Sequence, residues 1–382
     1  MLCKSIVRLK LFVVLCACVV IAGCGSSSKR ETTIEQRQDQ MDQQQVHVSA
    51  AQEQTGIEQV EEVVEKPAPA EEPEQVNDTE QAASGVVIAL KFEPGDVTDY
   101  QLITEGVKSV LWEGPEGSKP AGFNGGHTGT DITMFFKQRV ESTNDQGNGI
   151  LRITINQMKY RSRVKDNVVL EFDSATSVDA DSPFASLIGQ SYTIEITPAG
   201  QVIRILDAAE ARAAVKGSSP AAQAARTLLS NDVIRERHTI GALPTKQANQ
   251  FQEGEKWSIN KSFDFGMMGH KEYEKVYELK AVKQTDGTRV AVAEMEAVPS
   301  AAQAQQMHQQ QSSSAFTRMF DNTQSFSGRL ELGLESGTVL EYVEDLQNEW
   351  LAVDPSFSGD AQNQPNALRM SARRLIHLQK ID

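Results

Sequence analysis

The chain has 382 residues, of which 39% are hydrophobic, and its 37 basic and 52 acidic side chains give a formal net charge of -15. A protein that neutralises nucleic-acid phosphates needs a surplus of Lys and Arg, so this charge argues against a nucleic-acid partner. At about 150 residues per domain, the length allows up to two ordinary domains.

Residues 1–23 have the pattern of a bacterial signal peptide. Lys4, Arg8 and Lys10 precede residues 11–22, an unbroken apolar run of 12 residues. That run is shorter than the roughly 20 residues of a membrane-spanning helix, so we expect a cleaved secretory signal.

The signal ends in Ile21-Ala22-Gly23-Cys24, which resembles the lipoprotein signal box, where a Cys thiol takes a diacylglycerol. The alternative is an ordinary signal peptide that happens to end near a Cys. All four cysteines lie within the first 24 residues, so the mature chain has no pair for a disulfide and no thiolate metal site. Gly25 in place of Asp favours the outer membrane under the enteric sorting rule. The membrane is therefore the first expected partner, through acyl chains such as palmitate on Cys24.

Residues 24–85 read as the lipidated Cys followed by an acidic, Gln-rich and Glu-rich tether. Between residues 31 and 85 there are 14 acidic side chains against only Arg37 and Lys66. Such a segment cannot bury enough apolar area to offset its ordering entropy, so we expect disorder. A coiled coil over residues 41–65 is the alternative, although the apolar positions do not hold a heptad.

The remainder predicts a mainly β fold with a few short helices, arranged as two related antiparallel modules of sandwich or half-barrel type, residues 86–240 and 241–382. Apolar residues alternate with polar ones at Leu151, Ile153 and Ile155, and the same period recurs through both modules. Asp286-Gly287 is the strongest hairpin turn in the chain.

The two modules share short motifs. The segment at residues 92–96 parallels the one at 251–255, and the region 136–157 parallels 277–296. We interpret this as an internal duplication, with shared turn chemistry in two unrelated sheets as the alternative.

Helical signals are few. Asp207 with Glu210 resembles a capping box before a short helix, and Ser219 with Pro220 opens a second helix through Leu229, with an extension to Ile234 as the alternative. Residues 299–320 form a Gln-rich insertion in the second module.

No motif predicts a cofactor or metal site. The Gly-rich stretch at residues 122–129 lacks the helix that a phosphate cradle needs, so a mobile surface loop is the better account. The six histidines show no metal-binding spacing, although His127 and His270 both lie in Gly-rich loops and could meet in a cleft.

Nothing predicts catalysis either. A Gly-x-Ser-x-Gly elbow does not occur. Glu294 and Glu296 share one face of a strand, where a solvated acidic face is the ordinary interpretation. We therefore expect a protein that is not an enzyme.

The motifs at residues 92–96, 172–174, 187–189, 192–202 and 253–257 resemble a family of uncharacterised bacterial envelope lipoproteins, over roughly residues 88 to 350. The resemblance implies an envelope protein and carries no assigned activity or functional residues.

Together these observations predict a lipid-anchored cell-envelope protein with a non-catalytic binding or scaffolding role toward envelope proteins or lipid. The alternative is a carrier of lipid or another hydrophobic ligand in the groove of a curled sheet. An enzyme of envelope polymers is a third possibility that would need a cleft with converging acids.

Overall fold

The computed structural model describes residues 85–381, except 115, 246–249, 266–269, 286, 301–319 and 354–366. As predicted, this part of the chain is mainly antiparallel β-structure with a few short helices. The strands are β1 (Val86–Val87), β2 (Val97–Glu113), β3 (Gly126–Thr143), β4 (Gly149–Val164), β5 (Asn167–Asp173), β6 (Ser191–Ile196), β7 (Val202–Ile205), β8 (Gln250–Phe251), β9 (Lys256–Asp264), β10 (His270–Thr285), β11 (Thr288–Pro299), β12 (Phe320–Gly333), β13 (Val339–Val353) and β14 (Ala367–Ile381). The helices are α1 (Ala208–Ala214), α2 (Pro220–Leu228) and α3 (Asn231–His238).

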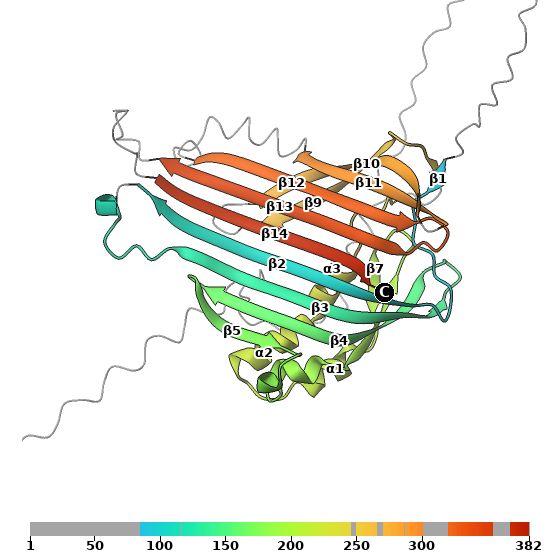
Figure 1. Ribbon diagram of the computed structural model, residues 1–382, viewed down its shortest axis with the longest axis horizontal. Coiled ribbons are helices and arrows are strands. Elements are labelled where there is room, and N and C mark those ends of the chain that lie inside the picture. The colour runs from blue at the N-terminus through green and yellow to red at the C-terminus, as the bar shows by residue number, and fades with distance from the viewer. Residues whose placement is uncertain are drawn as a thin grey trace, which may run out of the picture. The chain divides into compact units, whose positions relative to one another are not determined.

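Twelve of the strands form one sheet. Its order is β7-β6-β4-β3-β2-β14-β13-β12-β11-β10-β9, and β5 pairs with β4 beside this path. The first module contributes β2–β7 and the second contributes β9–β14, and the two meet where β14 pairs antiparallel with β2 (Figure 1). The strands of the two predicted modules, residues 86–240 and 241–382, thus lie in one continuous sheet.

The modules share a detailed hydrogen-bond pattern at their first turn. In each, a glycine with positive φ, Gly95 or Gly254, precedes the first long strand. The glycine amide donates to the carbonyl of a residue in a neighbouring strand. The amide of that strand residue donates to the carbonyl of the residue that follows the glycine, and a β-bulge comes next in the strand. The bonds are Gly95 N to Val140 O (2.8 Å), Val140 N to Asp96 O (2.9 Å), Gly254 N to Leu279 O (2.7 Å) and Leu279 N to Glu255 O (3.0 Å).

The sheet is strongly curved in its second half. We call the concave face, which carries Phe263, Phe326 and Arg374, the inner face. The guanidinium carbon of Arg374 on β14 lies 5.5 Å from the ring centroid of Phe263 on β9. These strands are five positions apart, which in a flat sheet would separate them by about 24 Å. In Figure 1, β9 and β10 accordingly pass behind the long central strands.

Helix α3 packs on the inner face. Its last residue, His238, stacks edge-on against Phe136 of β3 at a centroid distance of 5.2 Å, and its Nε2 atom lies 2.7 Å from the hydroxyl of Tyr192 on β6. All three side chains are buried, so they hold the helix against the first module. The helix is visible behind β2 and β3 in Figure 1.

The predicted helix starts are confirmed, but one capping mechanism is wrong. Ser219 caps α2 by accepting a hydrogen bond from the amide of Ala222, as Ser before Pro predicts. Asp207 precedes α1 but makes no capping bond. Its carboxylate instead accepts from the amide and the hydroxyl of Thr193 on β6, so it fastens the helix entry to the sheet.

The segment at residues 85–92 joins both modules at one end of the inner face. Ile88 and Leu90 are buried in the core, and the Leu90 amide donates to the carbonyl of Pro198 in the first module (2.9 Å). The Lys91 ammonium donates to the carbonyl of Leu334 in the second (2.6 Å). This end of the inner face is therefore closed by the chain itself.

Candidate functional site

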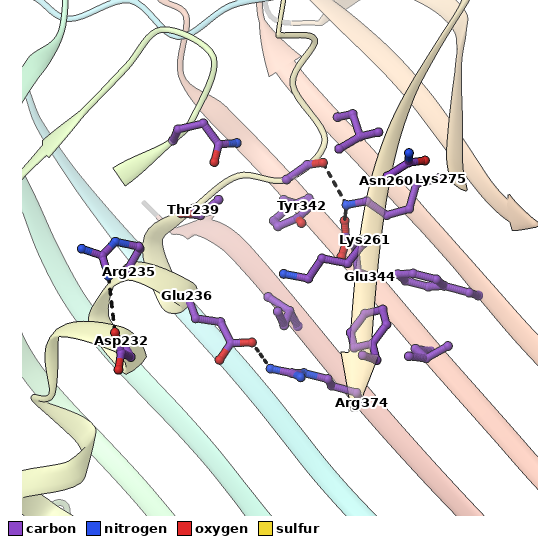
Figure 2. Close-up of a pocket in the computed structure, with 17 residues that line it drawn as sticks. Asp232, Arg235, Glu236, Thr239, Asn260, Lys261, Lys275, Tyr342, Glu344 and Arg374 are labelled. Atoms are coloured by element: carbon purple, nitrogen blue, oxygen red, sulfur yellow. Dashed lines mark hydrogen bonds and ion pairs between the residues drawn. The ribbon is translucent and has the colours of Figure 1, made fainter. Parts of the chain in front are cut away.

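A pocket of about 450 Å³ lies between α3 and the inner face of the second module (Figure 2). Strands β9, β10, β12, β13 and β14 form its floor, and residues 239–243, which we call the crossing segment, form one wall with α3. The volume lies within the usual range of small-molecule sites. The curvature of the sheet creates this space, because a flat sheet would leave no concavity beneath the helix.

One part of the pocket is apolar. Five of its lining side chains are fully apolar and come from four different strands: Ile259, Phe263, Phe326, Leu346 and Ile376. The Phe263 and Phe326 rings meet edge to face with centroids 5.6 Å apart. A ligand with an alkyl or aromatic portion would bury that portion here.

A buried ion pair lies at the other side of the pocket. Lys275 Nζ is 2.6 Å from Glu344 Oε1, and the two side chains are 2% and 9% exposed. The hydroxyl of Tyr277 also donates to Glu344 Oε1, at 2.8 Å. A buried charge is stable only when it is paired and hydrogen-bonded, and this cluster satisfies both conditions.

The same lysine binds the crossing segment. Lys275 Nζ donates to the carbonyl of Gly241 at 2.9 Å. A Cβ atom at Gly241 would lie 3.0 Å from Lys275 Nζ and 3.2 Å from the Tyr342 hydroxyl, so the glycine allows a close approach of the backbone to both groups. Trp257 Nε1 donates to the next carbonyl, that of Ala242, at 2.9 Å. The crossing segment is thus fixed to the second module after leaving α3.

Burial shifts the proton affinities of this cluster in opposite directions. Desolvation lowers the pKa of Lys275, and the adjacent Glu344 carboxylate partly offsets that effect. Burial, and then the Glu344 charge, raise the pKa of Tyr277 and of Tyr342 well above the ordinary value. Both tyrosines therefore stay protonated and act as hydrogen-bond donors rather than as bases.

The mouth of the pocket carries further charges. Arg374 of β14 forms an ion pair with Glu236 of α3, which links the helix to the sheet, and Arg235 pairs with Asp232 within the helix at 3.4 Å (Figure 2). Lys261 of β9 also lines the pocket and points toward its centre in Figure 2. Its ammonium lies 5.9 Å from the centroid of the Phe263 ring.

A groove in a curled sheet is the alternative predicted from the sequence, but that prediction names none of the residues of this pocket, although a signal for them exists. Residues 271–278 read Lys-Glu-Tyr-Glu-Lys-Val-Tyr-Glu. Alternation places Lys271, Tyr273, Lys275 and Tyr277 on one face and the glutamates on the other. Lysines rarely share the buried face of a strand with tyrosines, so this pattern indicates a polar cluster on the concave face.

The Gly-rich stretch at residues 122–129 is not the surface loop that we predicted. Its second half lies in β3, which begins at Gly126. A Cβ atom at Gly129 would lie 2.3 Å from the carbonyl oxygen of Gly106 on the paired strand. Gly129 therefore allows β3 to lie close to the paired strand β2.

The histidines are not brought together. His127 is paired with Asp166, with 2.7 Å between Nδ1 and Oδ1, and hydrogen bonds from the side chain and the backbone of His127 lower the pKa of that carboxyl. His270 begins β10, in the other module. Within the described residues there is no cluster of three potential metal ligands. Glu294 and Glu296 are exposed on β11, as predicted for a solvated acidic face.

The predicted lipidation site Cys24 and its signal box Ile21, Ala22 and Gly23 lie outside the described residues, as do the tether and the possible coiled coil over residues 41–65. Most of the Gln-rich insertion at 299–320 lies outside them too. None of the helices in the described part of the chain could span a bilayer.

The fold and the pocket place the protein in a structural class in which a curled antiparallel sheet carries a helix over its concave face. The chain belongs to the family of unknown function DUF6263, whose model matches residues 146–338. This confirms the predicted resemblance to an uncharacterised family.

No curated protein matches the chain. Among solved structures, the structure of DynF from the dynemicin biosynthesis pathway of Micromonospora chersina is similar over 82% of this chain and 94% of its own. The identity is 6% and the TM-score is 0.18, a value that carries no argument about this chain.

Proposed function

We propose that this protein is a non-catalytic binding protein of the cell envelope that holds an amphipathic, hydrophobic ligand in the pocket beneath α3. The observation that carries the proposal is the division of that pocket. Phe263, Phe326 and Leu346 offer an apolar surface, and Lys275 with Glu344 forms a polar cluster beside it. Amphipathic ligands need both surfaces within one cavity.

The location follows from the sequence. The signal at residues 1–23 and the box that ends at Cys24 support export and acylation, and Gly25 favours the outer membrane. The sequence predicts a disordered tether over residues 24–85, and a flexible chain of about 60 residues has a root-mean-square reach on the order of 45 Å, which would let the binding module work at some distance from the bilayer. The membrane is then a partner through the anchor, and the ligand comes from the envelope.

Binding accounts for the pocket better than catalysis does. The one carboxylate that the sheet contributes to the lining, Glu344, is held by Lys275 and Tyr277 and is not free to exchange protons with a substrate. The acids of α3, Asp232 and Glu236, are both engaged by arginines. Each charged group so paired serves structure or recognition, not general acid–base chemistry.

Native mass spectrometry of the full chain tests the proposal. Protein released from detergent micelles in the gas phase should retain a stoichiometric lipid in addition to the covalent anchor. The substitution Ile376→Trp fills the pocket and should remove the adduct. The control Leu375→Trp alters the neighbouring position, which faces away from the pocket in the alternating strand, and should leave the adduct unchanged. A clean mass in the unsubstituted protein would reject ligand binding and leave a scaffold for envelope proteins.

A further inference from the structure

We infer that the ligand of this pocket carries an anionic head group, a carboxylate or a phosphate ester, on its alkyl portion, and that Lys261 binds that head group at the pocket mouth. This inference rests on the proposed function and names the chemical class of the ligand. Its central observation is the distribution of charge around one ring, that of Phe263.

Two cations flank the Phe263 ring. Lys261 Nζ lies 5.9 Å and the Arg374 guanidinium carbon 5.5 Å from its centroid. A third cation, Lys271, is on the strand position directly paired with Phe263. An alkyl chain lying against Phe263 would therefore bring its head group among positive charges.

The carboxylates near the pocket do not neutralise all of these cations. Glu344 is bound to Lys275 and Glu236 to Arg374. Among the described residues, no carboxylate oxygen comes within ion-pair distance of Lys261, which lines the pocket and is exposed. A ligand anion would supply the missing partner.

Lys271, also on the inner face, has amide oxygens rather than a carboxylate as its partners among the described residues. Its ammonium donates to the amide oxygens of Asn348 (3.3 Å) and Gln324 (3.4 Å) and lies 5.2 Å from the centroid of the Trp350 ring. Neutral oxygens and an aromatic face solvate a cation without cancelling its charge. Desolvation lowers the pKa of Lys271 to about 8.

The charge of Lys261 also acts on the buried ion pair. The positive charge of Lys261 contributes to lowering the pKa of Lys275, so the two ammonium groups repel each other across the pocket. A bound anion would relieve this repulsion. The chain as a whole has a formal charge of -15, so these inward cations run against the net charge and are not part of a generally basic surface.

Photolabelling of the full chain tests the inference. The protein is placed in phosphatidylcholine nanodiscs with a hexadecyl chain that carries a diazirine and ends in either a carboxylate or an alcohol. Labelled peptides from β9, β12 and β14 are then quantified. We expect the carboxylate to label these peptides about tenfold more than the alcohol does, the preference that one charge-assisted hydrogen bond provides.

Substitutions of Lys261 test whether this residue causes the preference for the carboxylate probe. Lys261→Met should bring the ratio between the two probes close to one, and Lys261→Arg should restore it. The control Lys256→Met removes a cation from the same strand, where Lys256 pairs with Glu278 and does not line the pocket, and should keep the preference. Lys261 is exposed, so its substitution leaves the core intact. Equal far-ultraviolet circular dichroism of the variants checks this.

Competition separates the possible sources of the anion. Dodecyl phosphate should displace the carboxylate probe, whereas inorganic phosphate at the same concentration should not. Equal displacement by inorganic phosphate would overturn the inference, because the pocket would then take a free anion. Equal labelling by carboxylate and alcohol would overturn it too while sparing the proposed function. Absence of any pocket labelling would reject both.

Discussion

Lys275 and Glu344 form a 2.6 Å ion pair although their strands, β10 and β13, are separated in the sheet by β11 and β12. In a flat sheet strands three positions apart lie about 14 Å from each other. On the intervening β12 the nearby position is Gly328, where a Cβ atom would lie 2.8 Å from Met295 Cε and in ordinary contact, at 3.5 Å, with Glu344 Cγ. The ion pair therefore links non-adjacent strands across the curved part of the sheet.

The first prediction concerns the buried pair. Glu344→Gln leaves the Lys275 ammonium buried without a counter-ion, so we expect a loss of about 3–5 kcal/mol in the free energy of unfolding. The double substitution Lys275→Met with Glu344→Leu removes both charges and should recover most of that loss. Urea denaturation of the three variants measures the effect. A double variant as unstable as the single one would contradict the electrostatic explanation.

The second prediction concerns Gly328. Gly328→Ala should destabilise the protein by about 1–3 kcal/mol, because its methyl group would overlap Met295 Cε and the Val343 carbonyl, each at 2.8 Å. Gly106→Ala is the matched control, since a Cβ atom on this other strand glycine meets nothing within 4 Å. Thermal unfolding distinguishes the two, and an equal effect at both positions would mean that packing at Gly328 is not restrictive.

The regular elements could be predicted from the sequence because their signals are local. Alternation at Leu151, Ile153 and Ile155 marks β4, and Pro198-Ala199-Gly200 makes the predicted turn, in which the Gly200 amide donates to Thr197 O at 2.8 Å. The junction between β2 and β14 could not be predicted, since it pairs residues more than 250 positions apart and no local pattern records that pairing.

A ligand groove in a curled sheet is the alternative predicted from the sequence, but the residues of the pocket escaped prediction for a related reason. Whether Lys275 lies in water or in the core depends on the partner that a distant strand supplies, here Glu344. Similarly, Asp207 has the spacing of a capping residue, and only the position of β6 shows that Thr193 competes successfully for its carboxylate. In both cases a contact with a residue on another strand decides the role of the side chain, and the local sequence pattern does not contain that contact.

The third prediction is a pH dependence of stability. Burial, and secondarily the charge of Arg237, lower the pKa of His238 to about 3. The imidazole stays neutral in the folded state but gains a proton in the unfolded state below about pH 6.5. The unfolded state therefore binds more protons as the pH falls, and the folded state loses about 2 kcal/mol between pH 7 and pH 5.

The substitution His238→Gln tests this assignment. Glutamine keeps an acceptor for the Tyr192 hydroxyl, which lies 2.7 Å from His238 Nε2, but cannot be protonated in this range. Chemical denaturation at several pH values should show a smaller decrease in stability for the variant. Identical pH profiles would mean that another group controls the acid sensitivity.

The fourth prediction concerns the anchor. Cys24→Ser should abolish acylation, because serine offers no thiol to the diacylglycerol transfer, and should leave the unprocessed precursor. Metabolic labelling with radioactive palmitate and electrophoretic mobility measure both. Cys18→Ser is the matched control inside the signal and should be processed normally. Persistent labelling of the Cys24 variant would remove the basis for the envelope anchor.

The fifth prediction concerns exchange of the ligand. Arg374 and Glu236 tie α3 to β14 across the pocket mouth, whereas Asp232 and Arg235 pair within the helix. Glu236→Ala should release this tie and accelerate ligand dissociation by up to about fivefold, the range expected for one partly exposed ion pair. Asp232→Ala, in the same helix, should leave the rate near its original value. Stopped-flow displacement of a fluorescent alkyl carboxylate measures both rates. A slower dissociation in the Glu236 variant would show instead that Arg374, freed from its partner, binds the ligand more tightly than it closes the mouth.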